Sequence, residues 1–125
     1  MIPLVDIHCH LLAGLDDGPR TREDAVAMCR MAHGEGVRLM AATAHQSKRW
    51  PLTPQTILGA GQILEEDLRA AGIALDVFPS AEVMAEPETA DHWQAGKLLG
   101  MGGREAYLLI EMPRGVFVEI GRAHV

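Results

Sequence analysis

The sequence predicts an α/β fold built around a parallel sheet. Short apolar runs alternate with longer amphipathic stretches, a pattern typical of consecutive β-α units. Imidazole and carboxylate side chains follow the apolar runs, and in sheets of this class such groups gather at the carboxyl ends of the strands. With 125 residues the chain forms at most one domain, long enough to bury a sizeable core.

Four strands and three helices are expected along the chain. The strands are predicted at residues 2–5, 37–43, 73–78 and 107–110, the first of them buried. The first helix begins at Thr21, where a hydroxyl followed three residues later by a carboxylate forms a capping box, and it ends at Gly34. The second begins at Thr53-Pro54, a cap followed by a proline suited to the first turn, and ends at Gly72. A short third helix is predicted from Pro87 to about Ala95.

Composition and charge exclude several classes of protein. A formal net charge of −6 argues against a general nucleic-acid binder. No apolar run approaches the roughly 18 residues that span a bilayer, and the N-terminus lacks the pattern of a secretory signal. Cys9 and Cys29 form no C-x-x-C pair, and two unpaired thiols suit a reducing compartment. We therefore expect a cytoplasmic protein with no nucleic-acid partner and no membrane span.

The segment from Asp6 to His10 contains two histidines at alternate positions. Alternate side chains of a strand share a face, so His8 and His10 should point the same way while Cys9 points away. Their Cα atoms would lie roughly 6.5–7 Å apart, close enough for two imidazoles to bind one metal ion. The loop Asp16-Asp17-Gly18 could turn a carboxylate back toward them. An isolated pair of this kind would more often be two surface histidines.

Matching residues follow the other predicted strands. His45, Glu82 and Glu111 stand where a purely structural strand end would place valine or isoleucine. A buried unpaired carboxylate is costly, and a metal ion compensates for it. The six candidate ligands are His8, His10, Asp17, His45, Glu82 and Glu111. Imidazoles and carboxylates without thiolates suit manganese, iron or zinc in a catalytic site, and six groups indicate two or more clustered ions.

In order and spacing, these motifs resemble those of the PHP superfamily. Within it, the sequence resembles the bacterial manganese-dependent protein-tyrosine phosphatases of capsule and exopolysaccharide operons. The motifs that carry the resemblance are Asp6-Ile7-His8-Cys9-His10, Asp16-Asp17-Gly18, Ala42-Thr43-Ala44-His45, Ser80-Ala81-Glu82-Val83 and Leu108-Leu109-Ile110-Glu111-Met112-Pro113.

The resemblance implies a fold, a reaction and a partner. The fold would be the N-terminal part of a distorted (β/α)7 TIM-like barrel. The reaction would be hydrolysis of phosphotyrosine on a bacterial tyrosine kinase that controls polysaccharide export. The six candidate ligands would hold two or three Mn²⁺ ions, with iron or zinc as alternatives, and Glu82, His45 and Asp17 would also act in catalysis. The sequence does not indicate an oligomeric state.

Two departures from the family pattern stand out, and the end of the sequence is unusual in itself. Ala44 replaces a proline and Gln46 replaces a second histidine, a change expected to affect substrate contacts. Family members continue for about as many residues again, with a later histidine motif, a phosphate-contacting arginine and a terminal Asp-x-His pair, none of which this sequence contains. Residues 119–125 read back as GAG ATC GGA AGA GCA CAC GTC, a sequencing-adapter sequence. We therefore expect a partial PHP domain at 1–118 and a non-native tail at 119–125.

Several alternatives remain open. The substrate could be a small phosphate ester such as histidinol phosphate, or the chain could be an inactive truncated fragment. An amidohydrolase-type barrel would need a carbamylated lysine or further histidines where Glu82 and Glu111 stand. A cysteine-dependent phosphatase is excluded, because it would need arginine six positions after its cysteine, where this chain has Leu15 and Glu35. Lys48-Arg49-Trp50 could contact a phosphate or an aromatic ring, although a solvated loop is the simpler interpretation.

Overall fold

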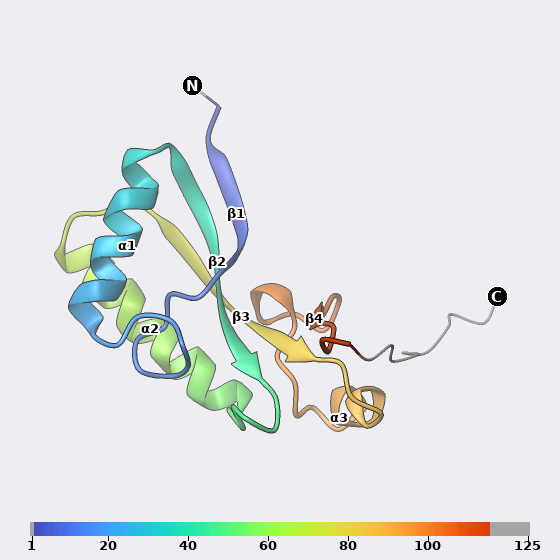
Figure 1. Ribbon diagram of the computed structural model, residues 1–125. Coiled ribbons are helices and arrows are strands. Elements are labelled where there is room, and N and C mark those ends of the chain that lie inside the picture. The colour runs from blue at the N-terminus through green and yellow to red at the C-terminus, as the bar shows by residue number, and fades with distance from the viewer. Residues whose placement is uncertain (1, 116–125) are drawn as a thin grey trace.

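Four parallel strands form one sheet in the computed structural model, which describes residues 2–115. The strands lie side by side in chain order: β1 (Leu4–Cys9), β2 (Val37–Gln46), β3 (Asp76–Met84) and β4 (Leu109–Glu111). Helices α1 (Arg22–Gly34) and α2 (Pro54–Ala70) connect the first three strands and cover the same face of the sheet (Figure 1). The short helix α3 (Thr89–Gln94) and the 3-10 turn η1 (Met101–Gly103) lie between β3 and β4. All strand carboxyl ends therefore meet at one edge.

Two further predictions from the sequence concern a membrane span and the end of the chain. Among residues 2–115, no helix combines the length and apolar character needed to cross a membrane. The predicted non-native tail at residues 119–125 lies outside the described residues, so it stays a prediction.

Both long helices begin where the sequence predicts. The Thr21 hydroxyl accepts a hydrogen bond from the backbone N–H of Asp24 at 3.1 Å. The Thr53 hydroxyl accepts one from the N–H of Thr56 at 3.2 Å, and Pro54 occupies the first turn of α2. Each cap satisfies a donor that the helix itself leaves free. The third helix is shorter than the predicted range 87–95, because the residues before Thr89 form a turn.

Strands β2 and β3 extend further than the apolar runs that predicted them. The second strand was expected to end at residue 43 and the third at residue 78, but the ladder continues to Gln46 and Met84. It pairs His45 with Glu82 directly across the two strands. These two residues therefore lie inside strands rather than after them, since backbone pairing continues past the point where the apolar pattern stops.

The prediction of a buried first strand is wrong for the described structure. Strand β1 begins two residues later than expected, and both Ile2 (85% exposed) and Ile7 (63% exposed) face solvent. Asp6 pairs with Met40 and Cys9 with Ala42, so three steps along β1 match two along β2. One extra residue in a ladder is a bulge, which bends the strand and redirects its side chains. The bulge spans Ile7 and His8, so it contains the first of the two histidines.

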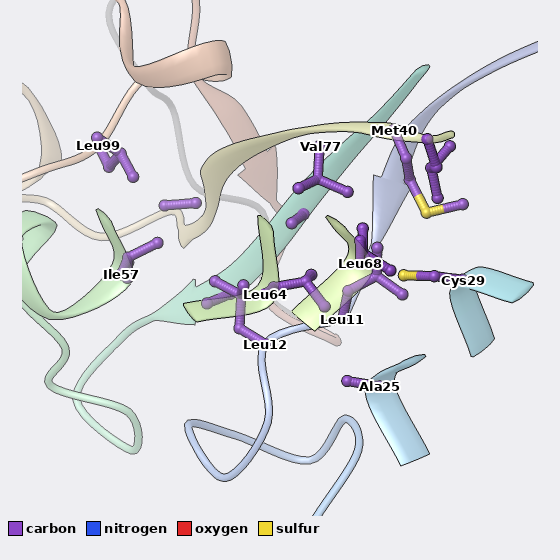
Figure 2. Packing of buried hydrophobic residues seen from close by; sticks show 14 of the residues in the cluster. Leu11, Leu12, Ala25, Cys29, Met40, Ile57, Leu64, Leu68, Val77 and Leu99 are labelled. Atoms are coloured by element: carbon purple, nitrogen blue, oxygen red, sulfur yellow. The ribbon is translucent and has the colours of Figure 1, made fainter. Parts of the chain in front are cut away.

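The core lies between the sheet and the two long helices. Cys29 of α1 and Leu64 and Leu68 of α2 pack with Leu11 and Leu12, which follow β1 (Figure 2). At Gly61 of α2, a Cβ atom would lie 2.1 Å from Cγ of Pro79 in β3. Only glycine lets the helix sit this close to the strand, so the packing fixes α2 against the sheet behind the functional edge.

Candidate metal centre

The carboxylate of Glu82 lies among three histidines at the carboxyl edge of the sheet. Its Oε1 is 3.1 Å from Nε2 of His10 and 3.3 Å from Nδ1 of His45, and its Oε2 is 3.1 Å from Nε2 of His8. The Glu82 side chain is only 11% exposed. A largely buried carboxylate that faces three imidazoles is typical of a functional site, because burying a charge is costly unless a partner compensates for it.

The two histidines of the first motif point the same way, as predicted. Their ring centroids are 5.5 Å apart, and both rings reach Glu82. Cys9 between them packs against the hydrophobic core instead. The N–H of His8 donates to Oδ1 of Asp6 at 2.9 Å, a local bond at the β1 bulge. The bulge and this bond set the direction in which His8 leaves the strand.

Asp17 and Glu111 complete the predicted set from the outer side. Asp17 Oδ1 is 3.1 Å from Nε2 of His45, and Glu111 Oε2 is 3.5 Å from Nδ1 of the same ring. The imidazole nitrogens and carboxylate oxygens form three groups, and in each group the ligand atoms all lie within 4.8 Å of one another. The groups are His10, Asp16, Asp17 and His45; His8, His10 and Glu82; and His45, Glu82 and Glu111. The structure thus brings all six predicted residues together.

Sequence reasoning did not select Asp16, which holds this arrangement in place. Its Oδ2 accepts from Nδ1–H of His10 and from the backbone N–H of His45, both at 2.9 Å, and its Oδ1 accepts from the N–H of Gly18 at 2.9 Å. The Asp16 side chain is 1% exposed. An aspartate followed two residues later by glycine is the signature of an Asx turn, which could have identified it.

Asp16 and His10 shift each other's pKa in opposite directions. Burial alone would raise the pKa of Asp16, but its hydrogen bonds from His10, His45 and Gly18 lower it overall. The hydrogen bond to Asp16 is the largest cause that raises the pKa of His10. Asp16 therefore stays ionised, fixes the Nδ1–H tautomer of His10 and aims Nε2 at Glu82, as a carboxylate commonly does behind a ligating histidine.

The loop after His45 is partly folded back over the site. Lys48 and Arg49 are exposed, in agreement with a solvated loop. Trp50 is half-buried, and its ring lies 6.4 Å from the His45 ring with an angle of 14° between the planes. The Gln46 side chain, by strand alternation, lies on the opposite face of β2 from His45.

The donor set fits metal ions. It consists of imidazole nitrogens and carboxylate oxygens without thiolates, a composition that suits manganese, iron or zinc in a water-containing site. His10, His45 and Glu82 each belong to two of the three groups, an overlap that suits neighbouring ions with shared ligands. The buried hydroxyl of Thr43, on the same face of β2 as His45, has no hydrogen-bond partner among the described residues.

Most of the chain matches a known protein family. Residues 4–123 match the model of a family described as capsular polysaccharide synthesis, CpsB/CapC. The chain belongs to this family. The tyrosine-protein phosphatase YwqE of Bacillus subtilis is 32% identical over 111 residues, which cover 88% of this chain and 43% of YwqE. The putative tyrosine-protein phosphatase CapC of Staphylococcus aureus is 26% identical over the same share of each chain.

Solved structures agree with this CpsB/CapC assignment. The chain matches a structure from the study of YwqE and of CpsB from Streptococcus pneumoniae, described as unique metal-dependent tyrosine phosphatases, with a TM-score of 0.83 and 32% identity. The match covers 88% of this chain and 44% of the solved one, so the chain spans about half the length of the relatives it matches. The predicted fold, an α/β half-barrel with a parallel sheet, is confirmed.

Proposed function

We propose that this chain is part of a metal-dependent protein-tyrosine phosphatase that acts in capsular or exopolysaccharide synthesis. In this proposal residues 1–118 form part of a PHP domain. The observation that carries the proposal is the position of Glu82, a largely buried carboxylate within 3.3 Å of three histidine side chains. Membership of the CpsB/CapC family supports it, as do the names of the relatives, which are tyrosine-protein phosphatases.

The proposed metal is manganese, in two or three ions, with iron or zinc as alternatives. The proposed ligands are His8, His10, Asp17, His45, Glu82 and Glu111. Bound ions would supply an acidified water molecule and neutralise charge on the phosphate.

The chain's own residues have distinct proposed roles at this edge. Glu82 presents one oxygen toward His8 and the other toward His10 and His45, a geometry that suits a bridging ligand. Asp16 holds the Nδ1 proton of His10, so that Nε2 is the ring atom available for a ligand bond. Asp17 lies on the outer side, where a phosphate would approach, and contacts His45 of the interior.

A partner and a compartment belong to the same proposal. The substrate would be a phosphotyrosine-bearing protein, and we propose a bacterial tyrosine kinase. Both cysteines are free, which supports a reducing compartment, and we propose the cytoplasm.

Metal content and turnover test the proposal together. We expect the purified chain, incubated with manganese and desalted, to retain at least one equivalent of metal and to hydrolyse a phosphotyrosyl peptide faster than p-nitrophenyl phosphate. The His8→Ala/His10→Ala variant should lose both properties, whereas Glu65→Gln, an exposed carboxylate on α2, should keep them. Less than one equivalent of metal and no turnover, from a folded sample, would instead support an inactive fragment.

A further inference from the structure

A cleft of about 720 Å³ lies beside the metal centre, at the same strand ends. Its lining includes Gln46 and Val83, the residues that follow His45 and Glu82 and face the other side of the sheet. One wall is formed by residues of the loop after β2 and of the first turn of α2, and the other by residues of α3 and of the segments on either side of it. In Figure 1, β2 ends beside the first turns of α2, and β3 ends beside α3.

Gln46 joins the two walls of the cleft. Its Nε2 donates to the carbonyl oxygen of Leu52 at 2.8 Å and to that of Lys97 at 3.1 Å, and its Oε1 accepts from the N–H of Leu99 at 2.9 Å. The Gln46 residue is 4% exposed. These bonds fix segments that are about fifty residues apart in the chain. The cleft is therefore a preformed feature, as binding sites usually are, rather than a gap between loose loops.

Trp50 connects the cleft with the metal centre. The residue lines the cleft, and its ring lies nearly parallel to that of His45 at 6.4 Å. Its loop is closed by two hydrogen bonds, from the N–H of Ser47 to the Trp50 carbonyl at 3.0 Å and from the N–H of Trp50 to the Ser47 hydroxyl at 3.1 Å. A substrate held at His45 would therefore have the cleft directly beyond Trp50.

The lining combines apolar side chains with charges of both signs. The apolar ones include Leu52, Val83, Met84 and Leu98, and the charged ones are Lys48, Lys97, Glu86 and Glu88. Within residues 2–115 none of these four charged groups forms an ion pair, as the charged pairs found there involve other residues. A polypeptide offers apolar side chains, backbone hydrogen-bonding groups and both charges. A small phosphate ester offers little beyond its phosphate.

We propose that this cleft binds the residues that flank phosphotyrosine in a protein substrate. Trp50 then marks the boundary between the subsite for the phosphotyrosine and the subsite for its neighbours. The inference rests on the proposed function, because it requires the phosphotyrosine to lie at the metal centre. It adds to that function a defined surface that would favour a protein substrate over a small phosphate ester.

Binding of two matched probes tests the proposal. One probe is N-acetyl phosphotyrosine amide, and the other is a fluorescein-labelled peptide with a central phosphotyrosine flanked on both sides by leucine, lysine and glutamate. Both carry a non-hydrolysable difluoromethylphosphonate in place of the phosphate. With manganese present, the affinity of the labelled peptide is measured by anisotropy, and that of the unlabelled amide by isothermal titration calorimetry. We expect the peptide to bind about tenfold more tightly than the amide, because the cleft adds contacts that the amide cannot make.

Variants of the cleft distinguish its role from that of the metal centre. His92→Ala and Met84→Ser, which alter lining residues, should weaken peptide binding by about fivefold to tenfold and leave amide binding unchanged. Asp91→Ala, next to His92 on α3 but outside the lining, is the matched control and should change neither affinity. Thermal melts of each variant check that the fold is retained.

The outcomes separate the two proposals. If the amide binds but the peptide gains no affinity, or if the cleft variants weaken both probes equally, the peptide subsite is wrong while the proposed function stands. If neither probe binds to a folded, manganese-loaded sample, the proposed function fails and the subsite fails with it.

Discussion

The metal centre has an inner and an outer group of residues that differ in how firmly the fold holds them. The inner group, His10, Asp16, His45 and Glu82, is largely buried and joined by direct contacts of 2.9–3.3 Å. The outer group is His8, Asp17 and Glu111, whose side chains are 44%, 63% and 36% exposed. In the inner group, His45 and Glu82 belong to the long β2–β3 ladder, Asp16 to its loop, and His10 follows β1; in the outer group, His8 belongs to β1, Asp17 to a loop and Glu111 to the three-residue strand β4. Burial and backbone support, rather than residue type, distinguish the two.

The largest expected effect comes from replacing the shared inner carboxylate. Glu82→Gln should weaken manganese binding by more than about 100-fold, because one substitution removes a charge that faces three histidines. Glu111→Gln, the matched outer change, should cost about tenfold, since within residues 2–115 the Glu111 carboxylate forms an ion pair with one histidine, His45. Isothermal titration with manganese measures both. In turnover, Glu82→Gln should also cost more than Asp17→Asn. Equal losses for inner and outer residues would remove the basis of the comparison.

Asp16 and Asp17 are adjacent in the chain, but Asp16 is buried and Asp17 is exposed, so replacing each one tests the contrast between inner and outer residues. Asp16→Asn should destabilise the fold by about 1–3 kcal/mol, because the buried carboxylate accepts three hydrogen bonds, and it should weaken metal binding by about 10–100-fold. Asp17→Asn should change the free energy of unfolding by less than about 0.5 kcal/mol, since Asp17 is exposed. Urea denaturation of the metal-free proteins tests this, and a larger effect at Asp17 would contradict it.

The smallest effect expected is a pH dependence of the metal-free protein. The pKa of His10 is raised, chiefly by its hydrogen bond to Asp16, so this contribution to stability is complete below the unfolded pKa of about 6.5 and is lost as pH rises through the raised value. The pKa of Asp16 is lowered, so its contribution is lost only as pH falls through that lowered value.

The difference in unfolding free energy between the wild type and His10→Gln should therefore be larger at about pH 5.5 than at about pH 8.5. Denaturation in the presence of a chelator at each pH measures it. A difference that stays constant with pH would show that the His10–Asp16 contact does not depend on charge. Because the Nε2 proton of His10 must leave before a metal can bind there, metal affinity should fall over the same range as the solution is acidified.

The sequence predicted the inner group less completely than the outer one. Side-chain alternation placed His8 and His10 on one face, and the order of motifs placed His45, Glu82 and Glu111 at one edge, because both inferences need only strand periodicity. Asp16 was passed over for Asp17, since adjacent aspartates look alike until the loop places one inside and the other outside. The helix caps at Thr21 and Thr53 were predictable because they depend on local hydrogen bonds.

Two features of the fold depended on contacts distant in sequence. The β1 bulge follows from how β1 and β2 pair, and the apolar composition of residues 2–7 predicted burial that the four-stranded sheet does not provide. The role of Gln46 likewise depends on Leu52, Lys97 and Leu99, which no local pattern connects with it.

The free side of β1 has a practical consequence. Within residues 2–115 this strand pairs with β2 alone, so its other backbone edge is open to a further strand, and Leu4, Val5 and Ile7 lie exposed along it. The chain is thus suited to complementation experiments, in which a separately expressed polypeptide pairs with this edge of β1. A rise in turnover above that of the chain alone, on mixing the two polypeptides, would then report their assembly.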